Sequence, residues 1–237
     1  MTDRKKIIDY IRKNRVSTTE VADALGKSGV LGKVAPITND HHVVGRIRCI
    51  FTANHSNYDL HEQVKAVKEG EVAMIFTHNC EEHAVIGELI SKFLLMYRGA
   101  AAVVVDGWVR DASALRRERY RVWSRGATPL GCFNTPALPF PKERKQEILS
   151  QYEGGVAVCD DGGVTMLEKS QLNSEIYSRL ERIELQEDVW FYCLDVLKWD
   201  THQIVCAKEY LKHPELMPEA FKVHMDSLSK ALDKVAA

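Results

Sequence analysis

The sequence lacks several features that would assign a protein to a specialised class. Charged residues interrupt every apolar stretch well short of the roughly 18 residues that indicate a membrane helix, so no such helix is predicted. Neither charge is in excess, because 32 Lys and Arg stand against 33 Asp and Glu. Strong attraction to nucleic acid or to an anionic membrane is therefore not expected. The chain also has no internal repeat and no low-complexity tract.

The six cysteines lie far apart and form no Cys-x-x-Cys pair, which is typical of reduced, mostly structural thiols. The chain starts with a charged rather than a hydrophobic segment. Together these observations predict a soluble, cytoplasmic protein. With 237 residues the chain can bury a substantial core, and one main domain with extensions is the expected organisation.

The first half of the chain alternates between helical and extended patterns. Ile7, Ile8 and Ile11 recur at helical spacing in an amphipathic segment, which we expect to form an exposed N-terminal arm over residues 1–16. The capping box Ser17-Thr18-Thr19-Glu20 predicts the start of a second helix. Strands are then expected at 43–51, 72–77 and 101–106, and helices at 57–69 and 86–97. This alternation predicts an α/β protein with some parallel strand pairing.

The second half has a different pattern, which favours antiparallel pairing. Asp160-Asp161-Gly162-Gly163 is typical of a hairpin turn between two short strands. From Ser170 onward the pattern is helical, with breaks at Pro214 and Pro218. We therefore expect a main domain over residues 17–168 and a C-terminal helical extension over 169–237. The predicted strands span 120–123, 128–133, 156–159 and 164–167, and a last apolar stripe comprises Phe221, Met225, Leu228 and Leu232.

Charged residues follow directly after the buried strand near residue 105. Arg110 and Asp111 lie at its carboxyl end, where open α/β sheets bind ligands. Asp111 offers oxygen ligands to a hard divalent cation, and the planar fork of Arg110 suits a carboxylate or a developing enolate. If Gly87 opens a helical turn, the backbone N–H groups of Leu89 and Ile90 can receive a substrate carboxylate. From the residues alone, an Arg-Asp pair at a strand end is more often a structural ion pair or a turn.

Two strings in this region resemble a family signature. Gly87-Glu88-Leu89-Ile90, followed after a helix by Val105-Asp106-Gly107-Trp108-Val109-Arg110-Asp111, is similar to the pattern of the family of regulator of ribonuclease activity A and 4-hydroxy-4-methyl-2-oxoglutarate aldolase. The resemblance covers about residues 17–168. It implies a three-layer α/β/β sandwich, here with an added C-terminal helical extension. It also implies assembly as a homotrimer or homohexamer with active sites between subunits.

The resemblance further implies a reaction and a role for each matching residue. Asp111 would be the direct protein ligand to Mg²⁺ or Mn²⁺. Arg110 would contact the substrate's keto oxygen and stabilise the enolate, and Glu88 would be the catalytic carboxylate that holds metal-bound water. Gly87, Leu89 and Ile90 would bind the substrate carboxylate. The implied activity is a lyase that releases pyruvate from a small 2-oxo dicarboxylic acid without a Schiff-base lysine. Aldol cleavage and oxaloacetate decarboxylation both pass through a pyruvate enolate, so one site can serve both reactions.

The sequence departs from the family pattern at several positions. Trp108 stands where the family usually has a smaller residue, so we expect a reshaped or partly filled pocket. The segment Glu153-Gly154-Gly155-Val156 replaces a Pro-Gly-Asp turn. The acidic residue that the aldolases take from a neighbouring subunit has no assigned counterpart. These departures favour, as an alternative, a non-catalytic binding or regulatory module related to ribonuclease E inhibitors.

Histidines and cysteines offer weaker candidates. His41, His42, His78 and His83 form no recognised metal-binding array, and ordinary surface or turn histidines are expected, although His83 precedes Gly87 by about one helical turn. Cys80 and Cys159 are expected to be buried, inert thiols.

Two further segments are expected to contact solvent or other subunits. The basic run 116–121 contains an interleaved acid and favours a solvated face or a subunit contact over RNA binding. The segment 189–194 is apolar on all sides, which predicts burial in the core or against a partner, with an interface preferred.

Overall fold

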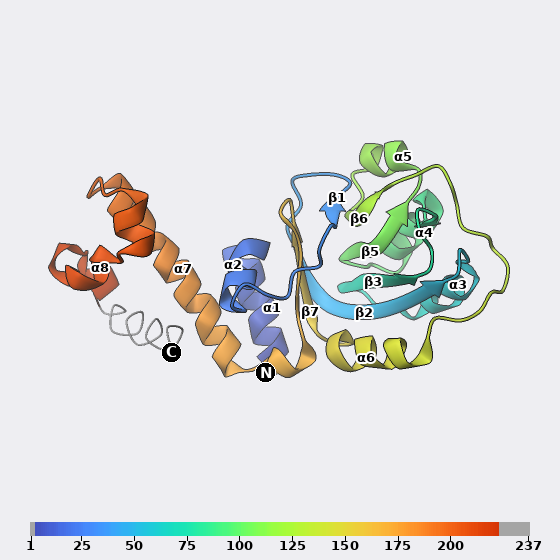
Figure 1. The fold of residues 1–237 in the computed structure, drawn as a ribbon, viewed down its shortest axis with the longest axis horizontal. Helices are drawn as coiled ribbons and strands as arrows, with labels where there is room; N and C mark the ends of the chain where they lie inside the picture. Colours follow the sequence, from blue (N-terminus) through green and yellow to red (C-terminus); the bar gives the residue numbers. More distant parts are fainter. Residues whose placement is uncertain (1–2, 223–237) are drawn as a thin grey trace. The chain divides into compact units, whose positions relative to one another are not determined.

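The structure is a computed structural model that describes residues 3–222 (Figure 1). The chain forms two compact units, residues 1–176 and residues 177–237. Within the described part of the chain, no helix combines the length and the apolarity needed to cross a membrane.

The first unit is built on an eight-stranded mixed sheet with the order β1-β6-β5-β3-β2-β7-β8, and β4 pairs with β5 outside this path. Strands β2, β3 and β5 run parallel to one another, as the alternating first half of the sequence predicts. Strand β6 also pairs parallel with β5, which contradicts the antiparallel pairing expected for the second half. The edge strand β1 and the β7–β8 hairpin are antiparallel. The strands are β1 (Ala35–Pro36), β2 (Val43–Ala53), β3 (Glu71–His78), β4 (Ala84–Ile86), β5 (Ala102–Val109), β6 (Val122–Ala127), β7 (Val156–Asp160) and β8 (Gly163–Leu167).

The apolar central strands are buried on both faces, because alternate side chains enter two separate clusters. On one face, Ile75 of β3 and Val105 of β5 pack with residues from helices α3, α4 and α5. On the other, Met74 packs with Ile148 of α6 and with Val164 of β8. The hairpin end of the sheet thus covers one face of the central strands, and α6 runs alongside the long strand β2 (Figure 1). This confirms the predicted α/β/β layering.

Two local predictions for the first unit are confirmed, a capping box and a turn between strands. The capping box at Ser17 is present, with the Glu20 N–H donating to Ser17 Oγ over 3.2 Å and the Ser17 N–H donating to a Glu20 carboxylate oxygen over 2.6 Å. The predicted turn between β7 and β8 is also present, where the Gly162 N–H donates to Asp160 Oδ1. The helical segments are α1 (Asp3–Asn14), α2 (Thr18–Ala24), α3 (Tyr58–Gln63), η1 (Val64–Ala66), α4 (Glu88–Lys92), the π-helical η2 (Phe93–Tyr97), α5 (Ala112–Arg117), α6 (Lys142–Tyr152) and η3 (Lys169–Gln171).

Two expectations for this unit are wrong, and one helix was missed. Helix α1 is not an exposed arm, because Ile7 and Ile11 are fully buried and Arg12 donates a hydrogen bond to the Val44 carbonyl of β2. The range 128–133 forms only isolated bridges rather than a strand. Helix α6 was not predicted, because among its eleven residues only Ile148 is buried and the apolar periodicity is weak.

The second unit is helical, as predicted for the C-terminal extension. It contains most of α7 (Ser174–Asp195), the π-helical η4 (His202–Cys206), α8 (Glu209–Lys212) and η5 (Pro214–Leu216). The apolar segment 189–194 is divided: Val189 and Cys193 join the core of this unit, whereas Phe191 is 60% and Leu194 41% exposed. Of the last predicted stripe, Met225, Leu228 and Leu232 lie outside the described residues.

Candidate functional site

Strand β5 places two charged residues at the carboxyl end of the parallel sheet. Arg110 follows Val109 directly, and its N–H donates to the Ile86 carbonyl over 2.9 Å, which ties the end of β5 to the end of β4. Asp111 comes next, at φ +60° and ψ +32°, and is the N-cap residue of α5. This left-handed conformation is uncommon outside glycine, although aspartate adopts it more readily than most residues.

Gly87 and Asp111 meet where β4 turns into α4. The Glu88 N–H donates to Asp111 Oδ2 over 3.0 Å, so the aspartate accepts from one of the unpaired N–H groups at the start of this helix. A β-carbon on Gly87 would lie 2.3 Å from Asp111 Oδ2 and 2.8 Å from Arg110 Cγ. Only glycine therefore fits at this position with the aspartate in place.

A cavity of about 450 Å³ opens beside this contact. Of the predicted site residues, Gly87, Leu89, Ile90, Arg110 and Asp111 line it. In a helix the first N–H groups have no intrahelical acceptor, so those of Leu89 and Ile90 are available to a ligand. The remaining lining residues are Asn57, Tyr58, His61, Glu62, Ala84, Val85, Ile86, Cys132 and Asn134.

Arg110 is held loosely beside Asp111. Its Nε lies 3.8 Å from Asp111 Oδ2, and its side chain is about half exposed. The guanidinium lies over Gly131, where an added β-carbon would come within 2.9 Å of Nη1. An exposed ion pair of this length contributes little to stability, so the guanidinium is free to reorient towards an anion in the cavity.

Glu88 does not line the cavity, although the resemblance assigns it a catalytic role. Its carboxylate faces Arg117 of α5, with 3.9 Å between Glu88 Oε1 and Arg117 Nη2. Arg117 belongs to the basic run that we expected to be solvated or to contact a subunit, and its side chain is two-thirds exposed.

Trp108 does not line the cavity either. Its indole ring lies over Gly126 of β6, where an added β-carbon would come within 2.5 Å of Cζ3. Within this chain Trp108 therefore does not fill part of the cavity.

Asn57 is the lining residue that sequence reasoning missed most clearly. It lies just before α3, is 8% exposed, and donates from Nδ2 to the Val85 carbonyl of β4 over 3.1 Å. Its buried Oδ1 has no hydrogen-bond partner within residues 3–222. An asparagine before a helix is ordinarily a cap, so the pattern alone gave no reason to place it in a site.

The two candidate cysteines differ in their surroundings. Burial raises the pKa of the Cys159 thiol, as expected for an inert residue. Cys80 is also buried, but a hydrogen bond with the thiol of Cys132 lowers the pKa of Cys80 to about 7 and raises the pKa of Cys132. Because Cys132 lines the cavity, this thiol pair lies next to the site.

The donors at the site suit a hard divalent cation. Asp111 lines the cavity with its carboxylate. One carboxylate oxygen accepts a hydrogen bond from the Glu88 N–H, which fixes the orientation of the carboxylate. Carboxylate oxygens are what Mg²⁺ and Mn²⁺ prefer, and these ions often keep several water ligands when few protein ligands are present.

Comparison with known proteins identifies a family. Residues 18–166 match the family described as RraA-like: Aldolase/RraA. A Halalkalibacterium halodurans protein named "Putative 4-hydroxy-4-methyl-2-oxoglutarate aldolase" is 26% identical over 180 residues, which is 69% of this chain and 79% of that protein.

Two solved structures share the fold. An uncharacterised protein from Pseudomonas syringae pv. tomato aligns with a TM-score of 0.61 and 20% identity, over 81% of this chain and 92% of its own. Streptomyces coelicolor RraAS2, described as an unusual member of the RNase ES inhibitor RraA protein family, aligns with a TM-score of 0.58 and 19% identity, over 74% and 92%. On the family match, which spans residues 18–166 and so includes Gly87 and Asp111, the chain belongs to the RraA-like family, Aldolase/RraA.

Proposed function

We propose that this protein is a divalent-metal-dependent lyase that releases pyruvate from a small 2-oxo dicarboxylic acid. The reaction is aldol cleavage of the 4-hydroxy-4-methyl-2-oxoglutarate type, decarboxylation of oxaloacetate, or both. One observation carries the proposal: the start of α4, Arg110 and Asp111 converge on a single cavity at the carboxyl end of β5. The family match and the aldolase name of a relative support the same reaction class.

The substrate is anchored by its carboxylate in this proposal. The N–H groups of Leu89 and Ile90 receive the carboxylate beside the keto group, because they lack intrahelical acceptors and lie at the positive end of a helical turn. Arg110 contacts the keto oxygen, where its guanidinium can form charge-assisted hydrogen bonds. A carboxylate and an adjacent keto oxygen are the shared features of 2-oxo acids, so this pair of contacts selects that class.

Asp111 would hold Mg²⁺ or Mn²⁺. Glu88 would position a water molecule for this cation once its side chain has rotated away from Arg117. When bound, the cation supplies a Lewis acid at the keto oxygen. Gly87 leaves room for the aspartate, and the Glu88 N–H fixes its direction.

Arg110 acts on the charge that develops during bond breaking. In aldol cleavage, water held by Glu88 would take the proton of the 4-hydroxyl group as the carbon–carbon bond breaks, whereas in decarboxylation the leaving carboxylate carries no proton. In both reactions the electron pair of the broken bond passes into the pyruvate fragment as an enolate, and the other fragment leaves as a second 2-oxo acid or as CO₂. The guanidinium stabilises the negative charge on the enolate oxygen, and a proton then returns to the terminal carbon to give pyruvate. In keeping with the family resemblance, we propose a homotrimer or homohexamer in which a neighbouring subunit completes the site.

The first experiment measures pyruvate release from oxaloacetate and from 4-hydroxy-4-methyl-2-oxoglutarate, with Mg²⁺, with Mn²⁺ and with chelator. We expect metal-dependent release that Asp111→Ala abolishes while circular dichroism and unfolding stay unchanged. Asp161→Ala, another aspartate in a turn but far from the cavity in the β7–β8 hairpin, is the control and should retain activity. Release that is equal in the presence of chelator, or equal in Asp111→Ala, contradicts the proposal.

The alternative function is a non-catalytic regulatory module. The family description covers RraA as well as aldolases, and the exposed Phe191 and Leu194 on α7 offer apolar contact area for another protein. No turnover of either compound, together with a partner whose binding Phe191→Ser weakens, would favour this alternative.

A further inference from the structure

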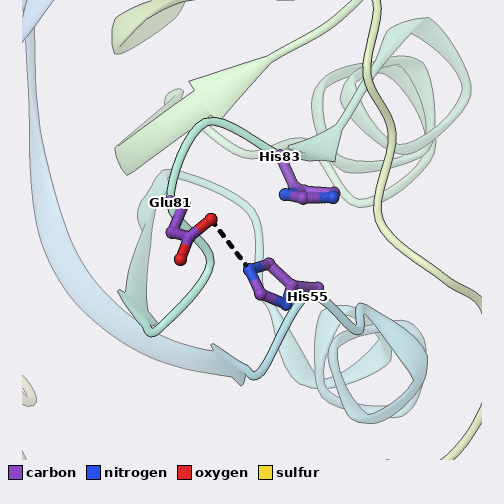
Figure 2. A group of neighbouring side chains, drawn as sticks. All are labelled: His55, Glu81 and His83. Carbon is purple, nitrogen blue, oxygen red and sulfur yellow. Dashed lines mark ion pairs between the residues drawn. The ribbon is translucent and has the colours of Figure 1, made fainter.

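Three potential metal ligands lie together outside the site described above. His55 comes from the turn after β2, and Glu81 and His83 come from the loop between β3 and β4, as Figure 2 shows. One ligand atom from each lies within 4.8 Å of the other two. His55 Nε2 is 3.5 Å from Glu81 Oε2, and the two imidazole rings have their centroids 4.3 Å apart.

One ring nitrogen of each histidine lacks a hydrogen-bond partner in the described part of the chain. His55 Nε2 and His83 Nδ1 are both buried, and neither has a hydrogen-bond partner among residues 3–222. Buried polar atoms are ordinarily paired, and two facing imidazoles cannot satisfy each other when both present a lone pair. A cation between them would satisfy both nitrogens and the carboxylate together.

The backbone around the cluster holds the ligands in place. Asn54, His55 and Glu81 all adopt positive φ values, of 55°, 57° and 46°, a conformation that is uncommon outside glycine. Hydrogen bonds maintain the two loops in this form: the Asn54 N–H donates to the His78 carbonyl over 2.9 Å, and Asn79 Nδ2 donates to Asn54 Oδ1 over 2.8 Å.

A second set of contacts fixes each histidine. The Phe133 N–H donates to the His55 carbonyl over 2.8 Å, and the His83 N–H closes a turn on the Cys80 carbonyl over 2.9 Å. The His83 ring also faces the Phe133 ring at a centroid distance of 6.4 Å. The three side chains are therefore brought together by the loop structure rather than by chance proximity of long, free side chains.

We propose that His55, Glu81 and His83 bind one divalent transition-metal ion, either Zn²⁺ or an ion with a similar preference for nitrogen and oxygen ligands. Two imidazoles and one carboxylate are a common zinc donor set, and a water molecule would complete a tetrahedral site. Mg²⁺ prefers an all-oxygen octahedral set, so this cluster is chemically distinct from the carboxylate site at Asp111. The inference does not depend on the proposed lyase activity.

The bound ion would connect the β2–α3 turn to the loop that precedes β4. His83 is followed by Ala84, which lines the candidate cavity, and β4 leads directly to Gly87. A metal at this cluster would therefore stiffen one wall of the cavity without contacting a substrate.

The test uses the full chain without a histidine tag, stripped of metal with chelator and titrated with Zn²⁺ in a calorimeter. We expect one Zn²⁺ per chain and a rise in the unfolding temperature on binding. His83→Ala and Glu81→Gln should each weaken Zn²⁺ binding at least tenfold. The Glu81 side chain is 70% exposed, so Glu81→Gln should fold even if a histidine variant does not.

Matched controls separate this cluster from other donors. His78→Ala and Glu82→Gln change neighbouring residues of the same types outside the cluster, and Asp111→Ala changes the other candidate metal ligand; all three should bind Zn²⁺ as the wild type does. Substituting Co²⁺ should give the visible spectrum of a tetrahedral nitrogen and oxygen site. Absence of Zn²⁺ binding, equal binding by Glu81→Gln, or a thiolate charge-transfer band that indicates Cys80 would each overturn the proposal.

Discussion

Asp111 Oδ2 occupies the space that a β-carbon on Gly87 would need, only 2.3 Å from that position. The two residues are 24 positions apart, yet the aspartate oxygen accepts the N–H of the residue that follows Gly87. Gly87 has φ −144°, which any residue can adopt, so close approach rather than backbone strain requires glycine here.

We therefore predict that Gly87→Ala displaces Asp111 and lowers pyruvate release by on the order of 100-fold, because small misplacements of catalytic groups have effects of this size. Gly32→Ala is the control, since nothing lies within 4 Å of its added β-carbon. Pyruvate release by the two variants, at matched folded fractions, is the measurement. Full activity of Gly87→Ala would show that the position of Asp111 is not critical.

Glu71 gives a prediction about stability. Its side chain is 5% exposed and accepts hydrogen bonds from Arg48 Nε over 3.1 Å and from the Lys68 N–H over 3.0 Å. This contact with Glu71 is the main cause of the raised pKa of Arg48. Glu71→Ala should lower the free energy of unfolding by about 2 kcal/mol, because charge-assisted hydrogen bonds are lost while Glu153 still pairs with Arg48.

Urea unfolding measures this loss, and Glu147→Ala is the matched control. Glu147 forms an exposed i,i+3 pair with Arg144, and such pairs contribute less than about 0.5 kcal/mol. A similar loss in both variants would mean that the buried position of Glu71 is not what makes its ion pair important.

The sequence predicted the central strands and the position of Arg110 and Asp111 for a local reason. Continuous apolar runs such as Val103–Val105 indicate strands buried on both faces, and charged residues after such a run lie at the sheet's carboxyl edge. Arg110 and Asp111 could therefore be placed from residues within one strand and its end.

The separate cluster of His55, Glu81 and His83 depends on contacts between distant segments. His55 and His83 are 28 positions apart, and they meet because the ends of β2 and β3 lie side by side in parallel register, which no local spacing records. The spacing of His83 from Gly87 suggested one helical turn, but strand β4 lies between them. Likewise, the periodicity of α1 showed that one face is apolar without showing that Ile7 and Ile11 are fully buried.

His41 predicts a pH dependence of stability. Burial, followed by the charges of Arg119 and Arg121, lowers its pKa in the folded protein below 6.5, while Asp161 partly opposes this shift. The unfolded chain then binds more protons than the folded chain as the pH falls through 6.5, so the folded state loses stability there. His41→Gln should make this loss shallower. Urea unfolding above and below pH 6.5 measures it, with His78→Gln as control, and an unchanged slope in His41→Gln would contradict the prediction.

Asn57 provides a test of the cavity that does not require turnover. The Val85 carbonyl can only accept a hydrogen bond, so the amide nitrogen of Asn57 must face it and the oxygen is left as a buried acceptor beside the cavity. Asn57→Ala removes the Val85 contact, which should lower the free energy of unfolding by about 1 kcal/mol.

The same substitution should also weaken ligand binding, because a ligand that binds only the folded state raises its stability in proportion to its affinity. We expect oxaloacetate to raise the unfolding temperature of the wild type and to raise that of Asn57→Ala by less. Asn134→Ala also changes a cavity residue, but an exposed one, and should respond nearly as the wild type does. An equal shift in Asn57→Ala and the wild type would contradict this prediction and would mean that the unpaired amide oxygen takes no part in binding.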